Sequence, residues 1–260
     1  MIPKIIHFCW MSGDPYPEKI QKCIDSWKKI LPDYEFWLWD SNRFDMESSV
    51  WVKEAFAARK YAFCADYIRC FALYTYGGIY LDSDVEVLKS FNDLLHLPYF
   101  IGMESAGHFE AATMGCEKGH PLFGKMLEHY KDRHFLDENG EPDIVIIPKI
   151  MMEIAQTDYR LVPIDNIEDF DYSPEVISVF PYDYFSPIDT RGKRYVLRQT
   201  VHTYSIHHFA SAWVSWQVKL LVRLFGNTKT MLNVKSGLSF LQKNLYKKPA
   251  AFIRKHKNKH

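Results

Sequence analysis

The sequence predicts an α/β protein with a mostly parallel central sheet, and two observations lead to that prediction. Short apolar, β-prone runs alternate with longer helical stretches over the first 85 residues or so, which is the pattern of a doubly wound sheet with helices on its faces. The chain is 260 residues long and 47% hydrophobic, which is enough for one large core. In such a sheet, ligands bind beyond the carboxyl ends of the strands.

The first half of the chain supplies the elements in a regular order. Pro17 is a favourable first residue for a helix, and Gly77-Gly78 is a strong helix stop. A helical stretch before that stop is expected to break near residues 59–60. The expected elements are a strand at residues 5–10, a helix at 17–31, a strand at 34–39, a helical stretch at 49–76 and a strand that ends at residue 82.

The pattern loosens beyond residue 91. Turn-forming residues cluster at 137–142, and residues 104–113 are expected to form a loop. Glu110 is a candidate ligand contact in that loop, and an exposed acid is the default. The remaining expected elements are strands at 98–103, 176–180 and 195–204 and helices at 120–134 and 150–155.

Two acids one residue apart, Asp82 and Asp84, follow the third strand. The strand delivers both carboxylates to its carboxyl end, where neighbouring like charges repel unless a cation lies between them. Oxygen ligands suit Mg²⁺ or Mn²⁺, which keep further coordination positions for a diphosphate. An acidic turn after a strand is also common on protein surfaces, so the motif alone leaves both interpretations open.

A second pair of charges lies on the helical stretch before that strand. Asp66 and Arg69 are three residues apart and have apolar neighbours on nearly every side. Such a pair is often a solvated salt bridge, but a helix this apolar is expected to be buried, and buried charges need partners or a function. The residues alone favour neither a structural ion pair nor a functional role.

Cysteine usage and the N-terminus indicate the compartment. The five cysteines include no Cys-x-x-Cys pair, which argues against a zinc ribbon or a disulfide framework. Cys9, Cys64 and Cys70 lie in apolar stretches and are expected to be buried thiols in a reducing compartment. With no secretory leader and no apolar run of about eighteen residues, the expected location is the cytosol.

The zero net charge hides a strong asymmetry. Residues 217–260 contain eleven Lys and Arg and no Asp or Glu, which leaves 21 basic against 32 acidic residues in 1–216, a net charge of −11. We therefore expect a domain at 1–216 and a basic tail at 217–260. The acidic body argues against a nucleic-acid-binding protein.

The basic tail carries apolar residues at near-helical spacing among its lysines. This pattern is typical of an amphipathic helix that lies on an anionic membrane surface. The alternatives are a helix packed on the acidic body, an oligomer contact, and a disordered tail like those that bind nucleic acids.

One ordered pattern joins the two charged pairs. It extends over residues 61–69 and 74–84 and holds Asp66, Arg69 and Asp82-Ser83-Asp84. The pattern resembles the sugar-binding region of glycosyltransferase family 32, which groups capsule and lipopolysaccharide transferases with yeast Golgi mannosyltransferases. It is also similar to the glucosyltransferase domain of the large clostridial toxins. The opening strand, which ends at Trp10, resembles theirs as well, so the resemblance is dense over residues 1–90 and returns at 206–213.

This resemblance implies a GT-A fold and a retaining transferase that uses a nucleotide-activated sugar, with Mn²⁺ or Mg²⁺ as cofactor. Carried over by position, the catalytic residues are Asp82, Asp84 and Arg69. The donor site is implied to consist of Trp10, which stacks on the nucleobase, Asp66, which binds donor hydroxyls, and Arg69, Tyr80, Asp82, Ser83 and Trp213. An indole face suits a base, and an Arg fork suits phosphate oxygens.

The metal site is implied to contain Asp84, Asp82 and one of two adjacent histidines. Related enzymes carry a His followed by an aromatic residue and, a few residues later, a Trp. Successive strand residues point to opposite faces, so only one of His207 and His208 should face the metal. His208, which precedes Phe209, fits the pattern better, and a pair of structural histidines is the alternative. The family more often has Gly before its Ser-Trp pair, and Ser211-Ala212-Trp213 departs from this.

The expected function is a metal-dependent retaining glycosyltransferase. It would move a hexose from a nucleotide sugar, with a UDP-hexose favoured over GDP-mannose, to a sugar hydroxyl of a capsular polysaccharide, O-antigen or lipopolysaccharide acceptor. It would act in the cytoplasm, with the tail attaching it to the inner face of the cell membrane. The alternatives are a protein-modifying, toxin-like transferase and a non-catalytic module that binds sugar nucleotides or membranes.

Overall fold

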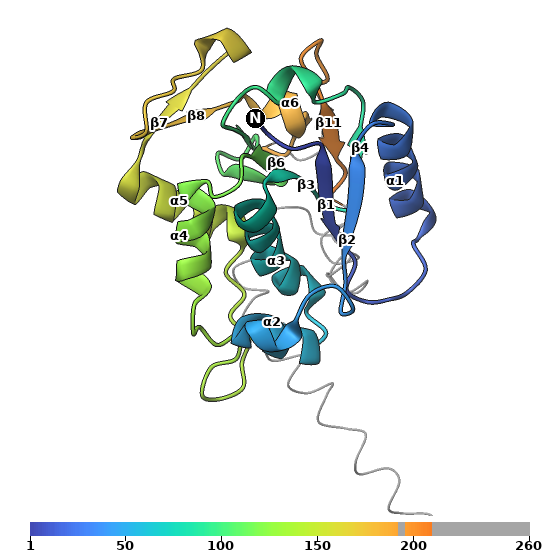
Figure 1. The fold of residues 1–260 in the computed structure, drawn as a ribbon, viewed down its shortest axis with the longest axis vertical. Coiled ribbons are helices and arrows are strands. Elements are labelled where there is room, and N and C mark those ends of the chain that lie inside the picture. Colours follow the sequence, from blue (N-terminus) through green and yellow to red (C-terminus); the bar gives the residue numbers. More distant parts are fainter. Residues whose placement is uncertain (192–195, 210–260) are drawn as a thin grey trace, which may run out of the picture. The chain divides into compact units, whose positions relative to one another are not determined.

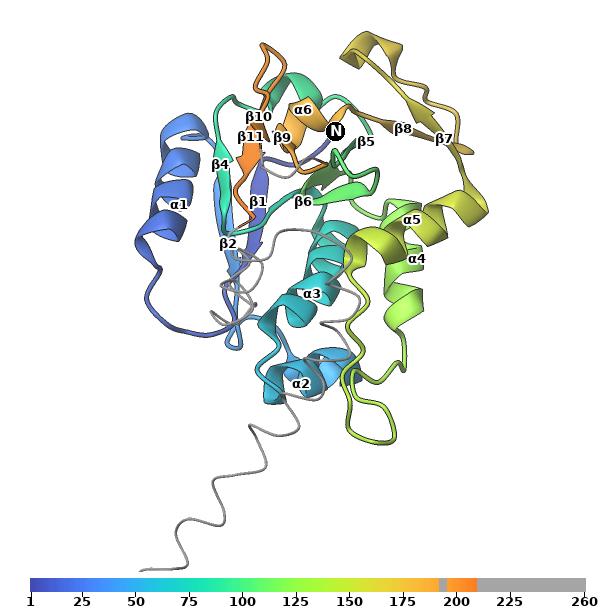
Figure 2. The same cartoon turned by 180° about the vertical axis from the view of Figure 1, so that it is seen from behind.

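The structure is a computed structural model that describes residues 1–191 and 196–209. Its centre is a five-stranded sheet in the order β2-β1-β3-β6-β5 (Figures 1 and 2). The strands are β1 (Ile5–Cys9), β2 (Glu35–Trp39), β3 (Gly78–Leu81), β5 (Tyr99–Met103) and β6 (Phe109–Cys116). Strands β1, β2 and β3 are parallel, and β6 runs antiparallel to both β3 and β5. The predicted α/β class with a mostly parallel sheet is confirmed.

Helices cover the sheet on both sides. They are α1 (Glu18–Ile30), α2 (Val50–Ala57), α3 (Tyr61–Tyr76), α4 (Pro121–Tyr130), α5 (Ile147–Asp158) and the single turn α6 (Tyr182–Phe185). Helix α3 packs against β1, β3 and α4, and α1 lies on the other side of β1 and β2 (Figures 1 and 2). The expected break in the helical stretch is confirmed, because Arg59 between α2 and α3 has a φ of 55°.

The turn from α3 into β3 depends on glycine. Gly77 and Gly78 have φ values of 69° and 106°, which favour a residue without a Cβ. A Cβ on Gly78 would also lie 2.7 Å from the carbonyl oxygen of Ile5 in β1. The two glycines therefore let β3 begin directly after the helix while it lies close against β1.

Short strands outside the central sheet bring distant segments together. Strand β4 (Val85–Val87) follows the two acids and pairs antiparallel with β11 (Ser205–His207). The indole N–H of Trp27 in α1 donates to the carbonyl of Val85, which ties β4 to the body of the domain. The other two pairs are β7 (Arg160–Pro163) with β8 (Val176–Val179), and β9 (Ile188–Asp189) with β10 (Val196–Leu197).

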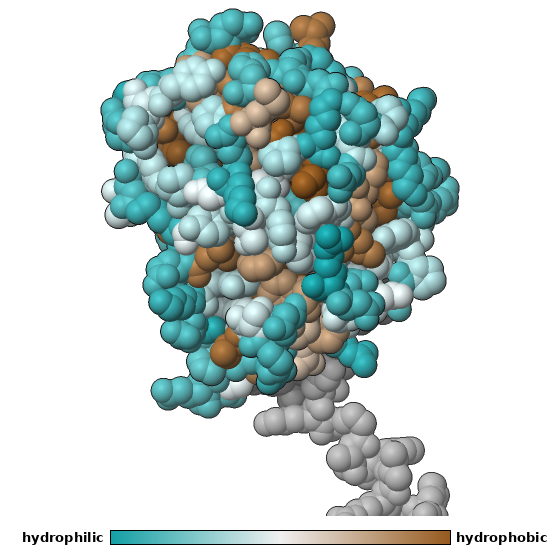
Figure 3. All heavy atoms as spheres, viewed as in Figure 1, coloured by the Kyte–Doolittle hydropathy of each residue, from teal (hydrophilic) through white to brown (hydrophobic). Residues whose placement is uncertain are grey.

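The core is rich in aromatic side chains, and Trp27, Trp51 and Tyr80 are among its largest fully buried members. All five cysteines are free and buried, as expected for Cys9, Cys64 and Cys70. Hydrophilic residues form most of the surface in Figure 3, with hydrophobic ones scattered among them. In the described part of the chain, no helix has the length and apolar character that crossing a bilayer requires.

Two of the secondary-structure assignments made from the sequence are wrong. Residues 104–113 are not simply a loop, since β6 begins at Phe109 and each of its residues is buried. The strand expected at 195–204 is reduced to β10 (Val196–Leu197), and the last strand begins only at Ser205. The predicted division at residues 216 and 217 lies outside the described residues, as does the basic tail.

Candidate donor and metal site

The carboxyl ends of β1 and β3 open into one cavity of about 730 Å³. Because parallel strands end at the same edge of a sheet, the residue after β1 and the acids after β3 meet there. Seven of the site residues predicted from the sequence line this cavity: Trp10, Asp66, Arg69, Tyr80, Asp82, Ser83 and Asp84. Trp213 lies outside the described residues.

Trp10 forms part of the cavity wall. Its indole N–H donates to the carbonyl of Asp14, and its ring packs edge-on against Tyr16 with 5.1 Å between the ring centroids. The side chain is partly buried. The aromatic residue is therefore held in place by its own loop while it borders the cavity.

Arg69 is buried, and each of its three nitrogens donates a hydrogen bond. Its Nε and Nη1 donate to the carbonyls of Ala65 and Ala111, at 3.3 and 2.7 Å. Its Nη2 lies 3.1 Å from Asp66 Oδ1 and 3.3 Å from Asp82 Oδ1. The guanidinium thus joins α3, β6 and the turn after β3, and the apolar helix does bury both charges, as the sequence predicts.

Burial has a strong effect on Asp66. It raises the pKa of this carboxyl to about 7, with a further upward contribution from Asp82, while Arg69 acts in the opposite direction. The Tyr80 hydroxyl donates to Asp82 Oδ1 at 2.9 Å. Asp82 is therefore held by an arginine and a tyrosine before any ligand enters the cavity.

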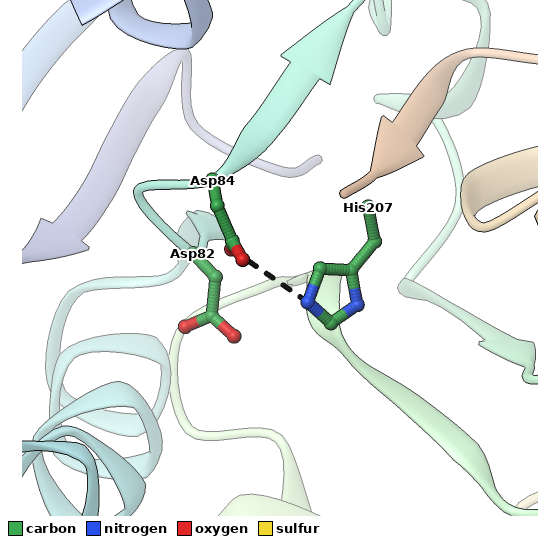
Figure 4. Close-up of side chains that lie close together, drawn as sticks. All are labelled: Asp82, Asp84 and His207. Carbon is green, nitrogen blue, oxygen red and sulfur yellow. Dashed lines mark ion pairs between the residues drawn. The ribbon is translucent and has the colours of Figure 1, made fainter. Parts of the chain in front are cut away.

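Asp82, Asp84 and His207 come together from two distant segments (Figure 4). One ligand atom from each lies within 4.8 Å of the others, and His207 Nε2 is 3.6 Å from Asp84 Oδ1. The pairing of β4 with β11 is responsible, since it sets His207 opposite Val85, the residue after Asp84.

His208 does not face the acids, so the predicted choice between the two histidines is wrong. Its Nε2 lies 2.9 Å from Glu86 Oε2, and its side chain is 43% exposed against 13% for His207. The alternation argument holds, because one histidine of the pair points inward and the other outward. The register of β11 on β4 decides which one, and the local sequence does not contain that register.

The acids around His207 favour a positive charge at this position. Burial alone would lower the pKa of His207, but Glu110, Asp84 and Asp82 together raise it to about 10. Two carboxylates and an imidazole nitrogen form a donor set that suits Mn²⁺ and, for the oxygen ligands, Mg²⁺. The residues present therefore fit a divalent cation, which would take the place of the imidazolium charge.

Glu104 and Glu110 line the same cavity. The sequence pointed to Glu110 only as a candidate contact for acceptor or donor hydroxyls, with an exposed loop acid as the default. Glu110 is not the expected exposed acid, since it lies in β6 with none of its surface exposed. Burial raises the pKa of Glu104 to about 8, and neighbouring Glu110 adds to this rise while His207 opposes it. The only signal for Glu110 is its position inside an apolar run, between Phe109 and Ala111-Ala112.

The part of the chain that contains Asp66, Arg69, Asp82 and Asp84 is similar to known proteins. Residues 17–101 match the family model for a glycosyltransferase sugar-binding region containing a DXD motif. Inositol phosphoceramide mannosyltransferase 3 of Schizosaccharomyces pombe is 39% identical over 136 residues, which are 49% of this chain and 37% of that protein. Mannosyl phosphorylinositol ceramide synthase CSH1 of Saccharomyces cerevisiae is 35% identical over 147 residues, which are 52% and 38% of the two chains.

The chain thus spans less than two fifths of the length of these two relatives. Among solved structures, the PaToxG glycosyltransferase superposes with a TM-score of 0.46 at 21% identity, over 60% of this chain and 68% of that one. The resemblance to DXD-containing glycosyltransferases that the sequence indicates is confirmed by the family match and by the relatives.

Proposed function

Because the chain carries the DXD-containing sugar-binding region of glycosyltransferases, we propose that it is a metal-dependent retaining glycosyltransferase that moves a hexose from a nucleotide sugar to an acceptor hydroxyl. The observation that carries the proposal is the meeting of Asp82, Asp84 and His207 in the cavity that Trp10 and Arg69 also line. The family match alone would leave the third ligand and the nucleobase contact unassigned.

The residues of the cavity have separate tasks in this proposal. Asp82, Asp84 and His207 would hold the cation, which when bound neutralises negative charge on the departing diphosphate. Trp10 offers its indole face to the nucleobase, and Asp66 accepts hydrogen bonds from donor hydroxyls. Arg69 positions Asp66 and Asp82, because its hydrogen bonds to Asp66 and to two backbone carbonyls, together with its ion pair with Asp82, engage each nitrogen of the guanidinium.

The donor and the acceptor are the least constrained parts of the proposal. The opening strand with Trp10 favours a UDP-hexose, whereas the two relatives described above are named as a mannosyltransferase and a mannosyl-lipid synthase, which favours GDP-mannose. The acceptor we propose is a sugar hydroxyl of a capsular, O-antigen or lipopolysaccharide glycan. The names of those relatives add a phosphoinositol lipid headgroup to the acceptors that an assay should include.

A screen of nucleotide sugars by thermal shift, with Mn²⁺ and with EDTA, tests the donor and the metal together. A ligand that binds only the folded protein raises its apparent melting temperature. We expect a shift with one nucleotide sugar and Mn²⁺ that EDTA abolishes, and release of the free hexose or its transfer to an acceptor. Asp84→Asn should lose the metal-dependent part of the shift. Glu86→Gln is the control and should keep it, because Glu86 in β4 contacts His208 and is not part of the Asp82, Asp84 and His207 group. An unchanged shift in Asp84→Asn would contradict the metal assignment.

We also propose that residues 217–260 attach the protein to the inner face of the cell membrane, where a lipid-linked acceptor would be found. The support is the eleven basic and no acidic residues of this segment, with apolar residues between them. Flotation with liposomes that contain anionic lipid measures this attachment. The full chain should float and a chain ending at residue 216 should not, and equal flotation of the two would overturn the proposal.

A further inference from the structure

Glu110 occupies an unusual position for a carboxylate. It lies in β6, the strand between β3 and β5, and is completely buried. One of its oxygens, Oε1, accepts the backbone N–H of Ala112 at 2.8 Å. The other, Oε2, is buried with no hydrogen-bond partner. A buried acid with an unsatisfied oxygen costs folding free energy, which a purely structural role in a strand does not require.

The ring of His207 lies between two acids. Its Nδ1 is 3.2 Å from Glu110 Oε1, and its Nε2 is 3.6 Å from Asp84 Oδ1. The Nδ1 contact has the distance of an ion pair, although the two groups are not aligned as a full hydrogen bond. Each nitrogen thus faces a different carboxylate, and Nε2 is the one that faces the DXD acids.

We propose that Glu110 is a positioning residue for His207, holding Nδ1–H so that the lone pair of Nε2 is presented to a divalent cation shared with Asp82 and Asp84. A carboxylate behind a metal-binding histidine sets its tautomer and ring orientation and makes it a stronger ligand. The inference rests on the metal site of the proposed function, and it adds a residue from a strand outside the matched region, residues 17–101.

The neighbouring acid–histidine pair, Glu86 and His208, differs from the pair formed by Glu110 and His207. His208 and Glu86 also form an acid–histidine contact, at 2.9 Å, but both side chains are at least 40% exposed. Exposed pairs contribute little, and this one faces away from the cavity. Glu104 supplies a second contrast, since it lines the same cavity with a carboxylate but has no direct contact with the ring among the described interactions.

The test is a titration of the full-length protein with Mn²⁺ alone, with free Mn²⁺ followed by electron paramagnetic resonance. Glu110→Ala should raise the dissociation constant for Mn²⁺ roughly 10- to 100-fold. Glu110→Gln keeps an acceptor for Nδ1–H but loses the charge, and should raise it by a smaller factor. Glu86→Gln should leave it unchanged, and Glu104→Gln, which alters a cavity carboxyl that has no direct contact with His207, should change it less than Glu110→Gln.

A double-mutant cycle separates positioning from simple charge. If Glu110 acts through His207, Glu110→Gln has no further effect on Mn²⁺ affinity in a His207→Ala background. An equal loss of affinity in both backgrounds, or an unchanged constant in Glu110→Gln, would overturn the inference, and the Gln variant serves should the Ala variant not fold. Absence of Mn²⁺ binding by the unaltered protein would instead refute the metal site of the proposed function. No sugar nucleotide is present, so the result does not depend on transferase activity.

Discussion

Replacing Arg69 by methionine should remove a cation that lies between Asp66 and Asp82. Methionine fills much of the same volume, so the main change is loss of the charge and of its hydrogen bonds. Arg69 is 5% exposed and its guanidinium lies 3.1 and 3.3 Å from the two carboxylates. It also donates to the carbonyls of Ala65 and Ala111, which lose these partners in the variant.

The expected loss of unfolding free energy is about 3–5 kcal/mol at pH 8, the usual cost of leaving a buried charge without its partner. The loss should depend on pH because Asp66 can take up a proton. With its pKa at about 7 in the folded protein and near 4 in the unfolded chain, the folded state holds the proton over this window. The free energy of unfolding therefore falls as the pH rises from about 4 to 7.

Removal of Arg69 extends that window upward, because Arg69 is the group that lowers the pKa of Asp66. Between pH 6 and pH 8 the variant loses stability over the whole interval, whereas the unaltered protein stops losing it above about pH 7. The difference between the two proteins should thus be about 1 kcal/mol larger at pH 8 than at pH 6.

Urea unfolding followed by tryptophan fluorescence at both pH values measures these differences. Arg69→Met combined with Asp66→Asn should recover part of the loss at pH 8 and remove its pH dependence. Arg160→Met, at an exposed ion pair with Asp171, is the control and should cost less than about 0.5 kcal/mol. A loss below about 1 kcal/mol in Arg69→Met at pH 8, or the same loss at both pH values, would refute the reasoning.

Two further predictions concern the sheet. Burial lowers the pKa of His7 to about 4, below its value near 6.5 in the unfolded chain, so the free energy of unfolding should decrease by about 3 kcal/mol as the pH falls through this window. His7→Gln should flatten the profile of unfolding free energy against pH, and an equally steep profile in the variant would contradict the assignment. Gly115→Ala should cost about 1–3 kcal/mol in urea unfolding, because a Cβ there would lie 2.3 Å from the ring of Phe100. Phe100→Leu in the same chain should restore part of that loss, and its failure to do so would point to another cause.

Sequence reasoning identified the parts of the site that lie close together in the chain. Asp66 and Arg69 are on one helix, and Asp82 and Asp84 follow the next strand, so apolar patterning and the Gly77-Gly78 stop were sufficient. The assignment failed where the decision is made by pairing between distant segments. Whether His207 or His208 points inward depends on the register of β11 on β4, and a shift by one residue would exchange the two.

Strand β6 was missed for a related reason. Its sequence, from Phe109 to Cys116, contains two alanines, a glycine and an acid and little of the β-branched character that predicts strands. Pairing with both β3 and β5 makes it a strand in spite of this. Glu110 was accordingly interpreted as a loop acid, since a buried carboxylate is recognisable only once its strand is known.

The two residues that the sequence did not assign correctly, Glu110 and His207, lie in a different part of the chain from the other site residues. The matched region, residues 17–101, includes Asp66, Arg69, Asp82 and Asp84, but Glu110 and His207 enter from β6 and β11, outside it. The DXD acids by themselves are two like charges that repel, and the groups that make the cluster suitable for a cation, the imidazole and the carboxylate behind it, come from the later strands. If the proposed metal site is correct, proteins that share the matched region can differ in metal affinity through β6 and β11 alone. A comparison of such proteins should examine the partner of the inward-facing histidine before it infers a common activity from the DXD motif.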